Sequence, residues 1–545
     1  MLSPGLAQEP SCYSDTVRLA LTVWFAAGCS LIQAQPPAIS QNGIVNSASL
    51  IPSALTDAAI ARNSRFFIQG VRLGGSSKDS RVLLRHDGQS LILPLLKIEA
   101  SRLEVWMPRE TPAGPASLLV ETAQGTSKPF SIAVVDSQIG LFSQNELGWG
   151  PGRIENIGAD GKRTPNGTDS PAQPGQVVVL RATGLGDSRA VDILIGGRRA
   201  RVIQLQRARD RDMDSLRVSV PLNAPEGCYV PVYARTPGLP PSNVVTMAIA
   251  TRQSHCQLEI GLQPQSSGGQ HRGVLGLSRT VSVLSADQAP LTTDEAFARF
   301  FNAEPSIYET NRIFLAPPAG TCTAYTGLFR SDISEFTSFS GAIGSLNETQ
   351  GLDAGKQFQL VGAEGKSRIV SHPPAVQGTY WAQLGLEGMS TRHSLPLFLS
   401  DAEYKITGTG GKDIGGFTRL VPAPPGLQWS NGDQLSTIHR ANGARIEWSG
   451  AAPDSIVLIL ALSFDQRTTA GGICYCTARG QTGSVLIPAE LMAHFPATQS
   501  IPGRPRSGVF VVALRQTAGM PPPIQGLDEL RILSIYSRFR KVSFD

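Results

Sequence analysis

Short apolar runs, bounded by Gly, Pro, Ser or Asp, recur along most of the chain. Examples are Phe66–Ile68, Val82–Leu84, Val177–Leu180 and Val509–Ala513. Runs of this length between turn-forming residues are typical of β-strands, whereas helices need longer periodic stretches. The pattern predicts an all-β fold, in which tandem immunoglobulin-like β-sandwich modules are followed by further β-rich domains.

One arrangement of strands and turns occurs twice in the N-terminal half. Pro108 and Gly114 of the first copy match Pro221 and Gly227 of the second, and the offset is 113 residues in both cases. Repetition at the length of a small domain indicates a tandem pair of modules.

One segment of the C-terminal half departs from the strand pattern. Residues Thr293–Phe301 begin with Thr-Asp-Glu and place Phe297, Phe300 and Phe301 at positions i, i+3 and i+4. This spacing predicts a short helix whose phenylalanines pack in a core. The predicted organisation is a signal peptide at 1–34, module 1 at 37–135, module 2 at 136–256, a β-rich domain with a short helix at 257–425 and a C-terminal β-sandwich-like domain at 426–545.

The N-terminus predicts export. The apolar run Leu19–Ala27 follows Arg18 and is closed by small residues before Gln35, which is the layout of a secretory signal peptide. The run is shorter than the roughly 20 residues that span a bilayer, which disfavours a transmembrane anchor. An alternative is a lipid anchor at Cys29. Either route predicts a protein of the cell envelope or extracellular space, with no membrane span in the mature chain.

Five cysteines remain after the predicted signal peptide, and an exported protein tends to pair them. Cys228 and Cys256 are expected to bond at the C-terminal end of module 2. Cys322 is expected to bond Cys476 or Cys474, which would leave one thiol free. A zinc site at the Cys474 and Cys476 pair is disfavoured, because no CxxC or histidine cluster accompanies it.

Charge does not point to a nucleic-acid partner. The formal net charge is +5 over 545 residues, and nucleic-acid binding normally needs a concentrated basic stripe. Asp210, Asp212 and Asp214 have the alternation of a calcium loop, but Ser215 replaces the turn-forming Gly. The same hairpin is rich in arginine, and its arginines could bind an anionic glycan. They are Arg198, Arg199, Arg201, Arg207, Arg209, Arg211 and Arg217. The interleaved aspartates are expected to cancel much of this positive charge.

No catalytic signature has the required spacing. The glycine-rich stretch Gly408–Lys412 lacks the Walker pattern, so we expect a glycine turn or bulge there. There is no GxSxG nucleophile elbow and no HExxH helix. The histidines are scattered singly, and a glycosidase pair drawn from acids such as Asp528 and Glu529 could be recognised only in the fold. We therefore predict no catalytic, cofactor-binding or metal-binding residue.

Several short motifs resemble a family of secreted bacterial proteins of unknown function whose modules are similar to IPT/TIG immunoglobulin-like domains. They are Gly43–Ser49, Asn166–Gly175, Ala182–Gly186, Ile195–Gly197 and Ser242–Thr246. The resemblance covers residues 37 to 256 and implies β-sandwiches, an envelope or extracellular location and no established activity. It extends, with less specific motifs, to three C-terminal segments: Leu352–Gly355, Gly408–Gly415 and Gly526–Asp528.

Together these features predict an exported, non-catalytic binding or spacer protein of the cell envelope. Its partner would be an extracellular glycan or an envelope protein, presented by loops on disulfide-stiffened sandwiches. The alternative function is a secreted carbohydrate-active enzyme or lectin-like protein with its site in the C-terminal half. A purely structural role is the third option.

Overall fold

The computed structural model describes most of the chain from residue 35 onward. The described residues are 35–74, 80–188, 190–209, 211–251, 255–258, 270–285, 288–303, 315–329, 350–362, 365–371, 376–388, 394–400, 402–465, 467–498, 507–517 and 523–545. The predicted signal peptide and Cys29 lie outside them. Residues Pro36–Asp545 form one compact unit, and the regular structure of its described residues consists of β-strands and short 3-10 turns. The all-β prediction is therefore confirmed.

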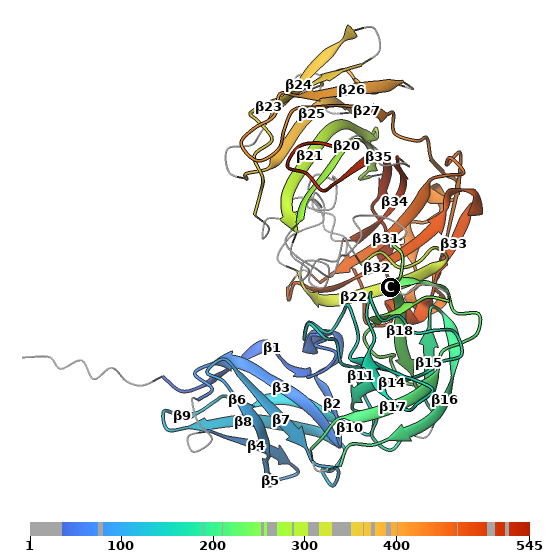
Figure 1. Cartoon of the computed structure of the whole chain (residues 1–545). Helices are drawn as coiled ribbons and strands as arrows, with labels where there is room; N and C mark the ends of the chain where they lie inside the picture. The colour runs from blue at the N-terminus through green and yellow to red at the C-terminus, as the bar shows by residue number, and fades with distance from the viewer. Residues whose placement is uncertain are drawn as a thin grey trace, which may run out of the picture. The chain divides into compact units, whose positions relative to one another are not determined.

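In module 1 the described residues form two sheets (Figure 1). The first runs in the order β1 (Ala38–Asn46), β3 (Ser64–Val71), β7 (Arg102–Met107), β6 (Leu95–Ile98). The second runs β2 (Ala59–Ala61), β10 (Phe130–Val135), β8 (Gly114–Thr122), β4 (Ser80–His86), β5 (Gln89–Leu93), with β9 (Gly125–Thr126) beside β8. Alternate residues of both sheets, such as Phe66 and Val120, meet in one hydrophobic cluster. This is a β-sandwich with the 3-10 turn η1 (Ser53–Leu55) at its end.

Module 2 is a second sandwich, formed by one continuous sheet that folds over a hydrophobic core. Its described strands run in the order β13 (Arg163–Pro165), β12 (Ile154–Ile157), β14 (Val177–Thr183), β17 (Asp214–Ser219), β16 (Arg198–Gln206), β15 (Asp192–Ile195), β18 (Gly227–Arg235), β19 (Val245–Ile249), with β11 (Gly140–Leu141) on β14. Strand β16 pairs with β15 at its start and with β17 farther along. Both parts face one hydrophobic cluster that includes Val178, Leu216 and Val232.

The two copies of the repeat occupy matching places in the two sandwiches. Gly114 begins β8 and Gly227 begins β18, with φ values of +127° and +152°. Both values lie in the region that favours glycine. The recurring proline-glycine spacing thus marks the start of the same strand in each module.

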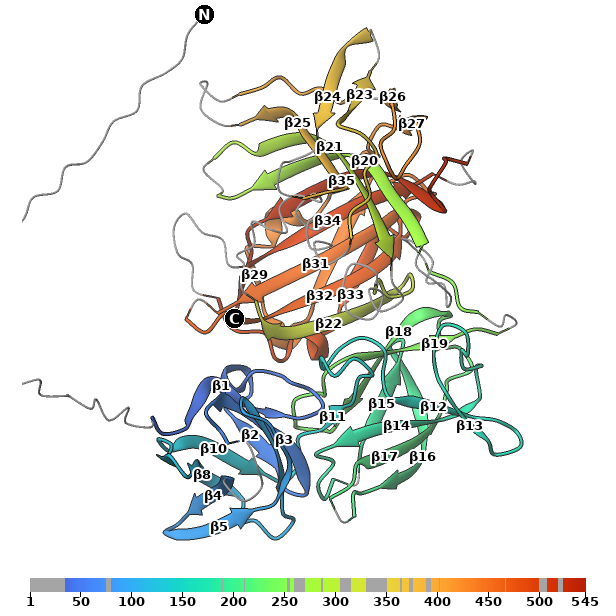
Figure 2. The ribbon, with the colours of Figure 1, turned by 60° about the vertical axis from the view of Figure 1, so that its left-hand side comes forward.

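Beyond module 2, the described residues form one sheet of twelve strands (Figure 2). Its order is β22 (Thr321–Leu328), β32 (Ala470–Arg479), β31 (Ile456–Phe464), β34 (Ser507–Gln516), β35 (Glu529–Arg540), β20 (Gln270–Val283), β21 (Leu291–Ala303), β25 (Thr379–Glu387), β24 (Ser367–Ser371), β23 (Gln357–Val361), β26 (Glu403–Gly408), β27 (Phe417–Pro422). The long parallel pairing of β20 with β35 joins strands from both sides of the predicted boundary at 425. The domain limits themselves stay a prediction.

Smaller elements cover the C-terminal part of this sheet. They are β28 (Gln428–Trp429), β30 (Ala444–Ser449) and β33 (Ser484–Ile487) in one sheet, the parallel pair β29 (Thr437–Ile438) and β36 (Ser543–Phe544), and the 3-10 turns η5 (Gly432–Gln434), η6 (Arg440–Asn442), η7 (Gly480–Thr482) and η8 (Ala489–Met492). Their apolar side chains, such as Trp429 and Ile446, pack on β31, β32 and β34 in one cluster.

The predicted helix at Thr293–Phe301 is wrong, because these residues lie in the long strand β21 between β20 and β25. In a strand, alternate residues point to opposite faces. Phe297 and Phe301 therefore enter one hydrophobic cluster, whereas Phe300 enters another on the opposite face. The i, i+3, i+4 spacing of phenylalanines reflects a strand buried on both faces, and the prediction that they pack in a core is confirmed.

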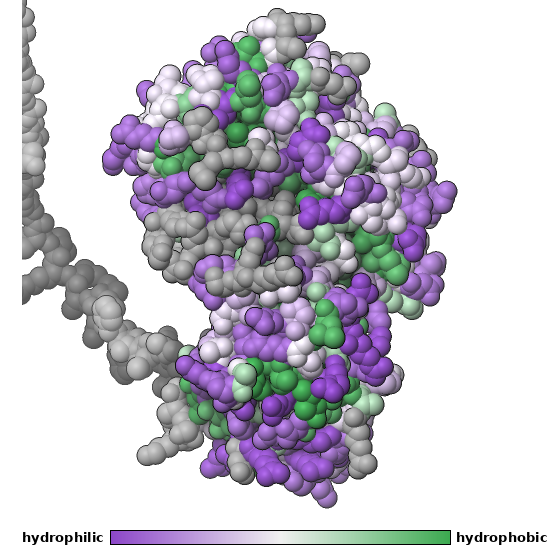
Figure 3. Space-filling model, turned by 45° about the vertical axis from the view of Figure 1, so that its right-hand side comes forward, coloured by the Kyte–Doolittle hydropathy of each residue, from purple (hydrophilic) through white to green (hydrophobic). Residues whose placement is uncertain are grey.

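One face of the molecule is mainly hydrophilic where its residues are described (Figure 3). Figure 3 shows hydrophilic residues over most of one face, with hydrophobic residues in small separate patches. No helix among the described residues is long and apolar enough to cross a membrane.

Candidate functional site

The outward face of strands β24, β23 and β26 carries a groove lined by polar side chains. In β23 the residues alternate, so that Phe358 and Leu360 are fully buried while Gln357 and Gln359 are exposed. The neighbouring strands follow the same alternation, because paired residues share a face. Gln359 lies opposite Ile369 of β24 on one side and Thr407 of β26 on the other.

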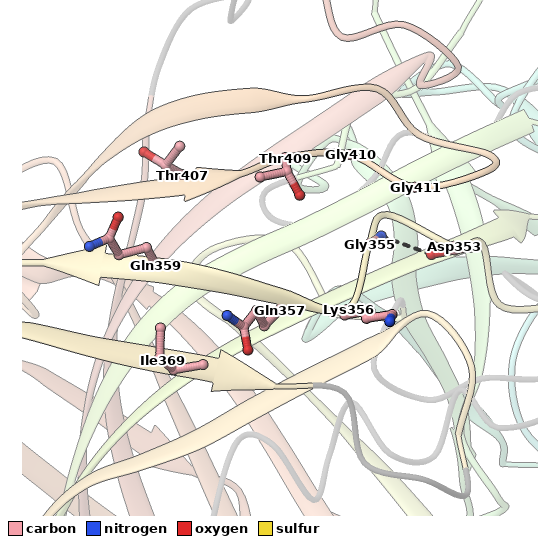
Figure 4. Close-up of a pocket in the computed structure, with 10 residues that line it drawn as sticks. All are labelled: Asp353, Gly355, Lys356, Gln357, Gln359, Ile369, Thr407, Thr409, Gly410 and Gly411. Atoms are coloured by element: carbon pink, nitrogen blue, oxygen red, sulfur yellow. Dashed lines mark hydrogen bonds between the residues drawn. The ribbon is translucent and has the colours of Figure 1, made fainter.

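The groove is open and its volume is about 1090 Å³. Figure 4 shows Gln357 and Gln359 on β23 and Thr407 on the adjacent strand β26, with a loop at one end. The residues that line the groove are Asp353, Gly355, Lys356, Gln357, Gln359, Ile369, Thr407, Thr409, Gly410 and Gly411. The side-chain amides of Gln357 and Gln359 make no hydrogen bond with any other described residue, so both remain available to a ligand.

An exposed tryptophan extends this face beyond the groove. Trp381 of β25 lies opposite Ser371 of β24, and Ser371 lies opposite Gln357 of β23. The three residues therefore form a row across the sheet. Trp381 is 36% exposed. Because its ring is large and apolar, it offers a flat stacking surface beside the polar groups.

Two loops close one end of the groove and hydrogen-bond each other. The Asp353 carboxylate accepts from the Gly355 amide at 2.8 Å and from the Lys412 amide at 3.3 Å. The Asp413 carboxylate accepts from the Asp353 amide at 2.9 Å. Both carboxylates thus serve loop geometry, and the Lys356 ammonium is the cation among the lining residues.

A buried tyrosine supports the same loop from below. The Tyr380 hydroxyl donates to the Gly355 carbonyl at 2.7 Å and accepts from the Ala354 amide at 3.0 Å. Burial raises the pKa of Tyr380, so the hydroxyl stays protonated and remains a donor.

The glycine-rich stretch that resembles a phosphate loop is the turn between β26 and β27. Gly410 has φ +88°, and a Cβ at Gly411 would stand 2.3 Å from the Asp353 carboxylate. The glycines therefore permit close approach of the two loops. A Cβ added at Gly526 would likewise collide with the Asp413 carbonyl. These close approaches show that the three C-terminal motif segments, Leu352–Gly355, Gly408–Gly415 and Gly526–Asp528, are neighbours in space.

The structure brings both predicted cysteine pairs to disulfide distance. Cys228 and Cys256 have Cα atoms 5.0 Å apart, and Cys322 and Cys476 have Cα atoms 4.0 Å apart. Cys474 is a buried free thiol. The choice that the sequence left open between Cys474 and Cys476 is decided by strand register, since Cys322 lies opposite Cys476.

The N-terminal motifs that carry the family resemblance contain asparagines that bind backbone. Asn46 donates to the Gln138 carbonyl at 3.0 Å and accepts from the Ala48 and Ser49 amides. Asn166 and Asn243 are likewise buried and hydrogen-bonded to distant backbone groups. These motif residues hold loops in place rather than face a ligand.

The calcium-loop candidate does not form a site among the described residues. Asp210 lies outside them. Asp214 is fully buried, and its two carboxylate oxygens accept from the Leu185 amide at 2.9 Å and the Ala208 amide at 2.7 Å. Burial raises the pKa of Asp214. Nowhere in the described part of the chain do three His, Cys, Asp or Glu side chains gather as metal ligands would.

The described histidines are likewise separate. His494 of the segment after η8 has Nε2 at 2.8 Å from the Pro241 carbonyl of module 2. His255 contacts Asp169, and His271 contacts the Gly526 carbonyl. His372 and His393 lie outside the described residues. Gln357, Gln359 and Trp381 were not among the site residues that the sequence predicted. The alternation Gln-x-Gln in this segment was the signal that could have indicated them.

No protein-family model matches the chain, and no curated protein matches it in sequence. Among solved structures, a surface glycan-binding protein of Bacteroides ovatus, SGBP-B in complex with a mixed-linkage heptasaccharide, is 11% identical over 79% of this chain and 93% of its own, with a TM-score of 0.13. SGBP-B of Prevotella bryantii is 13% identical over 33% and 35%, with a TM-score of 0.14. Titin domains A168–A170 are 12% identical over 71% and 98%, also with a TM-score of 0.14. At these TM-scores none of the similarities supports a functional assignment.

Proposed function

We propose that the protein is an exported, non-catalytic carbohydrate-binding protein whose site is the groove on β24, β23 and β26. The observation that supports this most directly is the pair of free amides, Gln357 and Gln359, on an open polar face that also carries Trp381. The proposal selects the glycan partner among those that the sequence left open.

The chemistry of the face suits a sugar chain. Each glutamine amide has donors and an acceptor, and each threonine hydroxyl can do both, so together they match the hydroxyls of a sugar ring. Trp381 can stack on the apolar C–H face of a ring at the edge of the groove. Neighbouring strands lie about 4.8 Å apart, so successive strands present polar groups along the path of an extended chain.

The carboxylates near the groove favour binding over hydrolysis. A glycosidase uses two carboxyl groups that flank the scissile bond and are free to donate a proton or attack. Asp353 and Asp413 lie close together, but each accepts backbone hydrogen bonds that fix the loops. Their role in this arrangement is to shape the end of the groove.

The N-terminal modules fit a spacer role, and we propose that both are IPT/TIG-like. Module 2 packs on the C-terminal part through Arg235, which donates to Glu490 at 2.8 Å, and through the edge-to-face contact of Trp149 with Tyr325. We propose that contacts of this kind help to orient the groove-bearing sheet on module 2. The cysteine pairs support an extracytoplasmic location, since disulfides persist in oxidising compartments.

The test is a glycan array followed by titration of any bound polysaccharide with the full mature chain. Replacing Gln357 and Gln359 together by alanine should weaken binding about ten-fold or more, because two hydrogen bonds are lost. The control is Q89A/Q124A, which removes two exposed glutamines from module 1, outside the groove. Equal binding by the groove variant and the wild type would overturn the site.

Two further outcomes separate the competing functions. W381A should weaken the same binding about ten-fold, and W381F should recover part of it through its smaller ring. New reducing ends formed by the wild type and abolished by D353N or D413N would instead establish an enzyme. If no glycan binds at all, the spacer role remains.

A further inference from the structure

A surface that carries several arginines lies on module 2, away from the groove. Strands β12, β14, β17 and β16 are adjacent, and their outward positions alternate with the buried residues of the module 2 core. Arg201 of β16 lies opposite Ser219 of β17, and Gln204 lies opposite Arg217. This places Arg201 and Arg217 on the same outward face. We call the two arginines with Gln204 and Ser219 the β16–β17 face.

Of the aspartates that interleave with these arginines in sequence, the two that the structure describes, Asp212 and Asp214, form no ion pair with Arg201 or Arg217. Asp214 points into the module, where it accepts two backbone amides and is fully buried. Asp192 pairs with Arg199 and with Arg235. The expectation that the hairpin cancels its own charge therefore fails for Asp214, whereas Asp192, which precedes the hairpin, neutralises Arg199.

One further acid of this sheet is also paired. Glu155 of β12 contacts Arg181 at 2.8 Å and Arg163 at 3.4 Å. Arg207 is bonded to the Gly186 and Ser188 carbonyls and is not part of the face. None of these pairs includes Arg201 or Arg217.

Arg201 and Arg217 are exposed, and neither has an ion-pair partner among the described residues. They are diagonal neighbours on paired strands, a relationship in which Cβ atoms lie about 7–8 Å apart. Two guanidinium groups at that spacing can converge on a single anionic group through paired N–H donors. Without a ligand the two like charges repel, so binding an anion relieves that repulsion.

We propose that the β16–β17 face is a binding site for a polyanionic polysaccharide, with Arg201 and Arg217 bound to its carboxylate or sulfate groups. The flanking Ser219 and Gln204 offer hydrogen bonds to the sugar hydroxyls between the charges. This site is separate from the groove and does not depend on it. A chain with regularly spaced acids fits the face better than a single small anion, because Arg163 and Arg181 of the same sheet share one carboxylate, Glu155, and so add a further net positive charge.

The experiment titrates the mature chain with polygalacturonate and with its methyl-esterified form, which has the same backbone without the charge. The wild type should bind the acid form alone, and binding should weaken as NaCl is raised. R201Q/R217Q should bind it about ten-fold more weakly, because two charge-assisted contacts are lost. Glutamine keeps part of the aliphatic stem of arginine, so the substitutions should not disturb packing. An unchanged thermal unfolding midpoint would show that the fold is intact.

The control is R81Q/R85Q, which removes two exposed arginines from β4 of module 1. Equal loss in both variants would show that general charge is responsible and would overturn the proposal. The proposal would also be overturned if the wild type bound the esterified polymer as tightly as polygalacturonate, or bound duplex DNA more tightly than polygalacturonate. If R201Q/R217Q loses polyanion binding but still binds a neutral glycan, the β16–β17 face is a site separate from the groove.

Discussion

Cys322 lies directly opposite Cys476 in the antiparallel ladder of β22 and β32, and their Cα atoms are 4.0 Å apart. Cys474 shares the same face of β32 two residues away, where it lies opposite Ala324. The register of one strand pair therefore decides which cysteine remains a thiol. Because the bond lies at the sheet edge and closes a loop with a sequence separation of 154, it constrains most of the C-terminal half.

Loss of this bond should destabilise the protein far more than loss of the free thiol. C322S/C476S should lower the free energy of unfolding by up to about 4–5 kcal/mol, the loop-entropy estimate for a closure of this length. C474A should cost about 1 kcal/mol, since it removes one buried sulfur from the core. Urea unfolding measures both.

Thiol titration gives the independent check. Burial raises the pKa of Cys474, so the native protein should show no reactive thiol among its described cysteines and the denatured protein one. A native protein in which Cys476 reacts would contradict the pairing.

Asn46 should be important for the contact between the two N-terminal modules. Its side chain joins the end of β1 to the Gln138 carbonyl and to the Ala48 and Ser49 amides. N46A leaves these buried groups unpaired, which should cost about 1–3 kcal/mol of unfolding free energy. The control N223A removes an exposed asparagine and should change little. Equal effects of the two substitutions on the urea midpoint would argue against the role.

His494 should make stability depend on pH in the weakly acidic range. Burial lowers its pKa below 6.5, although hydrogen bonds to the Pro241 and Leu55 carbonyls act in the opposite direction. The unfolded chain therefore binds a proton more readily than the folded one, and stability should fall as pH drops through 6.5 toward the lowered pKa.

The measurement is the unfolding free energy from pH 7.5 to 5 for the wild type and H494Q. Glutamine can keep a donor near Pro241 but does not titrate, so the variant should lose that part of the slope. Exposed His255 gives the control H255Q, which should retain the slope. Identical slopes in the wild type and H494Q would show that other groups carry the dependence.

The sequence predicted much of the fold through local chemistry. Glycines such as Gly114 and Gly227 adopt backbone angles that other residues avoid, so their spacing reveals the repeat. The phenylalanines of β21 misled the same reasoning, because a strand buried on both faces has no alternation to distinguish it from a helix.

The sequence by itself determined that this is a β-protein with a repeated module and with cysteines suited to pairing. It also predicts an export signal. Those properties follow from residue type and short-range spacing. Only the tertiary structure decided that Cys322 faces Cys476, that Gln357 and Gln359 share a face with Trp381, and that Asp214 turns inward while Arg201 and Arg217 stay exposed. The reason is physical: alternation tells which residues share a face of one strand, but sheet order and register decide which strands meet and which face solvent reaches.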